Sequence, residues 1–119
     1  MKPLLWVCSS KKDLAAMPAE AQDTFGYARH LAQDGARDVQ TKVLKGLGSA
    51  GDLEVVENMN GNTYRAVYTV RFHHAVYVLH CFQKKSTQGT ATPKPDMDLI
   101  RDRLKAVRVH MMRHSHDHD

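Results

Sequence analysis

The sequence predicts a small α+β fold in which helices pack on a short, mainly antiparallel sheet. Three features predict it: small and apolar residues at helical spacing early in the chain, three consecutive strand-like runs in the middle, and one amphipathic helix near the end. The chain has 119 residues, 42% hydrophobic and 25% charged. These values are typical of a single soluble domain.

The first part of the chain predicts one short strand followed by helices. Residues 4–8 are apolar and form the strand, and Ser10 is the expected N-cap of a short helix. Pro18 ends that helix and opens the next, which Gly35 stops. Residues 38–44 are expected to add a further helical turn or two. The longer helix buries its small and apolar positions: Ala21, Phe25, Ala28 and Ala32.

The middle of the chain predicts an antiparallel meander. The strand candidates are Leu53–Met59, Tyr64–Phe72, which alternates with period two, and the strongly apolar Ala75–Phe82. Asn60-Gly61 is a tight-turn signal between the first two, and His73-His74 separates the second from the third. The predicted order of elements is therefore β-α-α-β-β-β-α.

The last part of the chain predicts a surface loop, a helix and a tail. Gln83–Pro93 is polar and rich in turn residues, and Pro95 opens the helix. We expect a single domain over residues 1–109 and a flexible, His-rich tail over residues 110–119. The helix carries an apolar stripe: Met97, Ile100, Leu104, Val107 and Met111.

The charge is unevenly distributed. Residues 1–60 hold seven Lys/Arg against eight Asp/Glu, whereas residues 61–119 hold ten against five, and the net charge is +4. A basic half is typical of a protein with a polyanionic partner, although a solvated basic face is the commoner explanation.

Several classes of protein and site are excluded. No apolar run reaches the length of a membrane span, and residues 4–8 are too short for a signal-peptide core. Cys8 and Cys81 lack metal-ligand spacing, and Gly46-Leu47-Gly48 lacks the ending of a phosphate-binding loop. We expect a cytoplasmic protein without cofactor or structural metal. For the histidines of the tail, we expect adventitious binding of nickel or zinc rather than a structural metal site.

The strongest candidate site is basic. Arg65 and Arg71 share one face of a strand, and Lys84-Lys85 end the next strand. Antiparallel pairing about His73-His74 brings Tyr64 or Arg65 opposite residues 81–83, beside the lysines. Such a cluster fits phosphate binding. The alternative is that Arg65 pairs with a carboxylate across the strands, for instance Glu57. His80 is either a general acid or base or a hydrogen-bonded core residue.

Several ordered segments resemble one known family. The most specific is Val76–Thr87, close to a "VYVLHxFxKKS" pattern. The others are Ser9–Leu14 with Pro18, Phe25–Ala28 with Gln33–Gly35, Lys42–Gly48 as "KxLKGLG", Leu53-Glu54, and Tyr64–Tyr68 as "YRxxY". Over about residues 4–108 the chain resembles the RelE/ParE toxin superfamily, in its phage-derived, HigB-like branch.

The resemblance implies a toxin of a type II toxin–antitoxin pair with a RelE-like fold. It implies a ribosome-dependent endoribonuclease (mRNA interferase) that cleaves mRNA by metal-independent attack of the 2′-hydroxyl on the adjacent phosphorus. The implied partners are mRNA, the ribosome with its RNA, and a helix-turn-helix antitoxin. The final helix could contact that antitoxin, although packing on the sheet is the simpler account.

The resemblance also implies roles for individual residues. Arg65 would clamp the scissile phosphate, and Lys84 and Lys85 would stabilise the transition state or protonate the leaving oxygen. Glu57 is the candidate base, with Lys42 or His80 as substitutes. The candidate RNA contacts are Lys42, Lys45 and Arg71.

Two other functions remain open at this point. A ParE-like toxin of the same fold would inhibit DNA gyrase without nuclease chemistry. A decayed prophage protein would keep the fold and antitoxin binding without activity.

Overall fold

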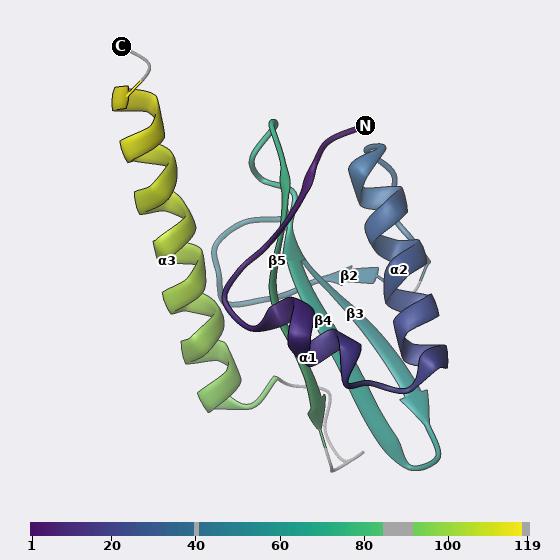
Figure 1. Ribbon diagram of the computed structural model, residues 1–119. Helices are drawn as coiled ribbons and strands as arrows, with labels where there is room; N and C mark the ends of the chain where they lie inside the picture. Colours follow the sequence, from purple (N-terminus) through teal and green to yellow (C-terminus); the bar gives the residue numbers. More distant parts are fainter. Residues whose placement is uncertain (40, 85–91, 118–119) are drawn as a thin grey trace.

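The computed structural model describes residues 1–39, 41–84 and 92–117, with side chains as far as residue 111. A five-stranded sheet in the order β1-β5-β4-β3-β2 lies between α1 and α2 on one face and α3 on the other (Figure 1). The elements are β1 (Leu4–Trp6), α1 (Ser10–Ala15), α2 (Ala19–Gln33), β2 (Thr41–Val43), β3 (Asp52–Met59), β4 (Asn62–Thr69), β5 (Val76–Lys84) and α3 (Lys94–Asp117).

The predicted α+β class is confirmed, and the sheet is mixed. Four strands, β2 to β5, form an antiparallel meander, whereas β1 pairs with β5 in parallel through Leu4↔Val76 and Trp6↔Val78. A parallel pair needs a long crossover, and the chain between β1 and β5 includes two helices and three strands. The N-terminal strand therefore takes the outer position beside β5.

The helix boundaries of the first part follow the predicted signals with one shift. Ser9, not Ser10, is the N-cap of α1, and its hydroxyl donates to the Asp13 carboxylate at 2.8 Å. Ser10 is buried, and its hydroxyl donates to the Val78 carbonyl at 3.1 Å. Pro18 caps α2, and Gly35 follows its end with φ +82°, a value that glycine adopts without strain.

Three predicted elements differ in the structure. Residues 38–44 contain the strand β2 rather than a helical turn, because Thr41 and Val43 are β-branched and pair with β3. The strand predicted over Tyr64–Phe72 starts and ends earlier, as β4. The final helix, α3, extends to Asp117 and so includes most of the residues expected in the tail.

The two hairpins set the register of the sheet. Asn60 and Gly61 both have positive φ, as a two-residue turn requires, and Met59 faces Asn62. Between β4 and β5 the register shifts at Val67/Tyr68, which face His80 and Val78, so Leu79 is the additional residue of a β-bulge. Such a bulge redirects the side chains that follow it.

The sheet separates two cores. On the face covered by α1 and α2, here the α2 face, the predicted helix positions Ala21, Phe25, Ala28 and Ala32 are buried. On the opposite face, the α3 face, Ile100, Leu104 and Val107 pack on Val67, Tyr77, Leu79 and Phe82. The predicted stripe of the final helix is thus confirmed. None of the helices in the described ranges has the length and apolar character needed to cross a bilayer.

Candidate functional site

The predicted register of β4 and β5 is confirmed. Arg65 faces Phe82, and Thr63 faces Lys84. Because side chains alternate along a strand, Arg65 and Lys84 lie diagonally on the α3 face, a separation of about 7–8 Å for such pairs. Lys85 lies outside the described residues.

Arg65 lies in a buried ion pair. Its guanidinium nitrogen Nη1 lies 3.2 Å from Glu54 Oε2, and the two residues are 3% and 1% exposed. Thr92 donates its hydroxyl to the same Glu54 oxygen at 2.9 Å, and Arg65 Nη1 donates to Thr92 Oγ1 at 3.4 Å. Both charges are therefore held by partners that replace the water they lost.

The expected pairing of Arg65 with a carboxylate across the strands is confirmed, but that carboxylate is Glu54 and not Glu57, the example given. Glu57 faces Tyr64, whose side chain belongs to the core of the α2 face. Glu57 therefore lies on the opposite side of the sheet from Arg65.

A basic pocket of about 460 Å³ opens over Glu54. Its walls come from β2, the segment after β2, Thr92 and the first turns of α3, and its cations are Lys42, Lys45 and Arg101. Lys42 Nζ lies 3.7 Å from Glu54 Oε1, and Arg101 Nη2 donates to the Gly46 carbonyl at 3.3 Å. Three exposed cations thus surround one buried carboxylate.

Arg71 has a structural position away from this pocket. Its guanidinium binds both carboxylate oxygens of Asp52, which is fully buried, with an Nε–Oδ1 distance of 3.0 Å. The guanidinium nitrogen that binds Asp52 Oδ2, Nη2, also donates to the Leu47 carbonyl at 3.3 Å. Arg71 therefore ties the segment between β2 and β3 to the end of β4, and it does not line the pocket.

His80 lies on β5, just after the bulge, and is hydrogen-bonded in the core. Its Nε2 lies 2.8 Å from Asp96 Oδ1, and its ring stacks on Phe82. Because the carboxylate only accepts, Nε2 is the donor of this hydrogen bond and carries a proton. Burial lowers the pKa of His80 more than Asp96 raises it. The ring is thus neutral near pH 7, and its buried Nδ1 has no hydrogen-bond partner in the described structure.

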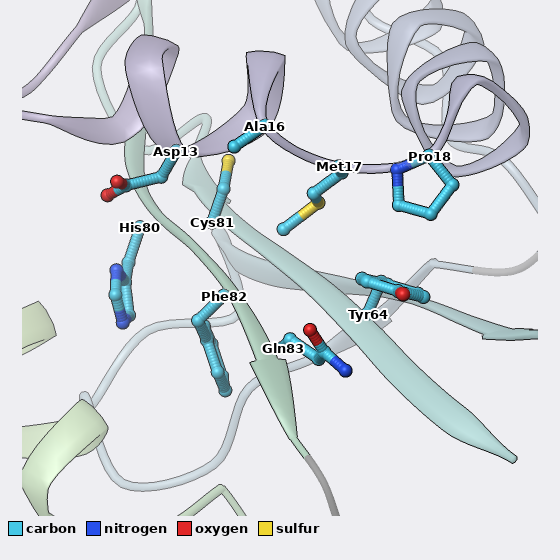
Figure 2. A pocket seen from close by; sticks show the side chains of 9 residues that line it. All are labelled: Asp13, Ala16, Met17, Pro18, Tyr64, His80, Cys81, Phe82 and Gln83. Atoms are coloured by element: carbon cyan, nitrogen blue, oxygen red, sulfur yellow. The ribbon is translucent and has the colours of Figure 1, made fainter.

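A second pocket, of about 710 Å³, lies along β5 beside α1 (Figure 2). It contains His80 and Cys81 but none of the cations around Glu54. Burial raises the pKa of the Cys81 thiol to about 12, so this thiol is not a nucleophile near neutral pH. Among the described residues, no group of three His, Cys, Asp or Glu side chains is placed to hold a metal ion.

Sequence reasoning missed Glu54, Thr92 and Arg101 as members of the basic pocket. A signal for Glu54 was present, because the two-residue turn at Asn60-Gly61 sets a register that turns Glu54 and Arg65 to the same face. Thr92 and Arg101 had no such signal, because their positions depend on how α3 packs.

A family model matches residues 12–105, from α1 to the middle of α3. Its description is "Phage derived protein Gp49-like (DUF891)". Comparison with curated proteins and with solved structures gave no match. The matched range includes the basic pocket, β5 and the turns that set the register of the sheet. The chain therefore belongs to the phage-derived Gp49-like family, a family of toxin–antitoxin-type toxins.

Proposed function

We propose that this protein is the toxin of a type II toxin–antitoxin pair, and that it is a ribosome-dependent endoribonuclease neutralised by a cognate antitoxin. The observation that carries the nuclease proposal is the basic pocket, where Lys42, Lys45 and Arg101 surround the buried Glu54. Family membership and the resemblance to HigB-like toxins support the toxin role.

The three exposed cations bind the RNA backbone in this proposal. Lysine and arginine side chains supply the charge that phosphate binding needs, and they stabilise the added negative charge of a pentacovalent phosphorus. Lys84 lies on the same face at the end of β5 and contacts a neighbouring phosphate. Lys85 remains a candidate from the sequence for the same role.

Glu54 replaces Glu57 as the proposed base. The 2′-hydroxyl transfers its proton to a Glu54 oxygen while its own oxygen bonds to phosphorus. The bond from phosphorus to the 5′ oxygen breaks, and Lys42, 3.7 Å from Glu54, protonates the leaving oxygen. The products are a 2′,3′-cyclic phosphate and a 5′-hydroxyl, so no water is consumed.

Arg65 becomes a positioning residue in this scheme. At 3% exposure its guanidinium is turned toward Glu54 and Thr92 and does not line the basic pocket. It holds the carboxylate in the floor of the pocket. Its replacement is therefore expected to disturb both folding and activity, whereas replacement of the exposed cations is expected to affect activity alone.

The test is induction of the chain in cells, with primer extension on cellular mRNA. Wild type should arrest growth and produce discrete cuts within translated codons. The triple variant Lys42→Ala/Lys45→Ala/Arg101→Ala should do neither, while Lys105→Ala, an exposed lysine of α3 outside the pocket, should match wild type.

Two results would overturn the nuclease proposal. Growth arrest with intact mRNA and an induced DNA-damage response would favour a gyrase inhibitor. Full toxicity of the folded triple variant would show that the basic pocket is not the site.

A further inference from the structure

Within the described residues, the second half of strand β5 has no neighbouring strand on the side away from β4. β1 covers that edge of β5 only from Val76 to Val78, because the chain leaves the sheet after Trp6 and turns into α1. Beyond the bulge, Arg103 Nη1 donates to the Leu79 carbonyl at 2.8 Å. From His80 onward, no strand in the described part of the chain pairs with β5 on the side away from β4.

The pairing pattern shows which main-chain groups face this edge. The Val78 carbonyl accepts from Val7 and the Val76 amide donates to Pro3, so both residues turn their main-chain groups toward β1. Along a strand, the N–H and C=O groups of successive residues point alternately to one neighbour and to the other. The additional residue of the bulge shifts this alternation by one residue, so that beyond it the odd-numbered residues point away from β4. The N–H and C=O groups of Cys81 and Gln83 therefore point to the open edge.

The second pocket follows this edge. Four consecutive residues of β5, from His80 to Gln83, all line it, although their side chains alternate between the two faces of the sheet. Only the edge of a strand brings both faces to one cavity. Figure 2 shows Ala16, Met17 and Pro18 along one side of the pocket, across from Phe82 and Gln83.

We propose that an extended segment of the antitoxin adds as a strand to this edge and hydrogen-bonds with the main chain of Cys81 and Gln83. The proposal rests on the proposed function for the existence of an antitoxin. It places antitoxin recognition away from the Glu54 pocket, since the two pockets share no residue.

The shape of the pocket favours a peptide over a second copy of this chain. α1 rises beside the edge and forms one wall, so the edge is recessed (Figure 2). A single extended strand fits such a groove, whereas the edge of another sheet with its covering helices would meet α1.

The walls also indicate the side chains of the peptide. Ala16, Met17 and Tyr64 offer an apolar surface toward one side of the incoming strand. At the other end of the pocket, the Asp13 carboxylate offers an acceptor (Figure 2). We expect a segment that combines an apolar side chain with a basic one.

The test uses Gln83→Pro, with Gln83→Thr as its matched control. Proline removes the Gln83 N–H that faces the open edge and leaves the bonds to β4 in place, because edge positions tolerate proline. Threonine removes the same side chain and keeps the N–H. The probe is the purified product of the reading frame adjacent to this one, measured by calorimetric titration against each full-length variant.

We expect Gln83→Pro to weaken binding by roughly tenfold or more, because the peptide loses the hydrogen bond to the Gln83 N–H and the adjacent main-chain hydrogen bond. Gln83→Thr should bind like wild type, and both variants should remain toxic. In case proline disturbs the strand, Ala16→Trp fills the groove from the α1 wall without touching β5, and it should weaken binding likewise.

The outcomes separate the two proposals. If the product of the adjacent reading frame binds Gln83→Pro and Ala16→Trp as tightly as it binds wild type, the edge proposal is overturned and the toxin function still stands. A free chain that is a dimer, and that Gln83→Pro makes monomeric, would overturn it in favour of a second copy. A non-toxic chain that no neighbouring product binds would overturn the proposed function, and the edge proposal with it.

Discussion

The two faces of the sheet differ in what they bury. The α2 face is closed by Phe25 and by small helix residues that pack against aliphatic and aromatic strand positions. The α3 face buries apolar residues near β5. Toward β3 it buries two ion pairs, Glu54 with Arg65 and Asp52 with Arg71. One face is thus closed by apolar packing, whereas the other also bears the cost of buried charge, and the proposed site lies on that second face.

The largest expected effect is a loss of stability when the core of the α2 face is opened. Phe25→Ala removes a side chain that is 1% exposed and leaves a cavity between α2 and the sheet. We expect the free energy of unfolding to fall by about 3–5 kcal/mol, measured by urea denaturation. The control is Tyr27→Ala on the same helix, at 59% exposure, which should cost under about 0.5 kcal/mol. A loss below about 2 kcal/mol for Phe25→Ala would mean that this face repacks.

The second prediction concerns the ion pair of the α3 face. Arg65→Met should lower the free energy of unfolding by about 3 kcal/mol, because Glu54 stays buried and keeps its contacts with Lys42 and Thr92 but loses the guanidinium that neutralises it. The double variant Glu54→Leu/Arg65→Met should lose less than Arg65→Met alone, because no unpaired charge is left.

An exposed ion pair is the control for this double-mutant cycle on Glu54 and Arg65. Asp98 and Arg101 lie 3.5 Å apart with about half of each side chain exposed. Their double-mutant coupling should stay below about 0.5 kcal/mol. Additive losses for Glu54 and Arg65 would show that the buried pair is not a unit, and the contrast between the two faces would then disappear.

The smallest expected effect is a pH dependence at His80. Burial lowers its folded-state pKa, despite the opposing effect of Asp96 and with Arg103 adding to the decrease. The unfolded chain therefore binds the proton first as pH falls below about 6.5. The stability contributed by neutral His80 is complete above that pH and is lost between it and the lower folded-state pKa.

The measurement compares urea midpoints at pH 7.5 and pH 5.5 for wild type and His80→Gln, which keeps a donor for Asp96. Wild type should lose more stability on acidification than the variant. Asp13 faces the same ring and raises its pKa, so Asp13→Asn should enlarge the loss. Equal losses in wild type and His80→Gln would show that His80 does not titrate in this range.

Features carried within one segment could be predicted from the sequence. Three such features follow from local spacing and turn chemistry: the helix that Pro18 opens, the turn at Asn60-Gly61, and the pairing of Tyr64 or Arg65 with residues 81–83. Residues 38–44 were misassigned, because three residues of an edge strand carry too short a pattern and pairing with β3 decides their conformation.

The sequence by itself determined which residues of a helix or strand share a face and where the basic end of β5 lies, because periodicity and hairpin register are properties of contiguous chain. Only the tertiary structure decided that Glu54 accepts Arg65, and that Lys42, Lys45 and Arg101 meet above it. It also decided that β1 pairs with β5 only as far as Val78, so that no strand in the described part of the chain covers the edge at Cys81 and Gln83. These contacts join distant segments, and their geometry is set by how α1 and α3 pack on the two faces of the sheet.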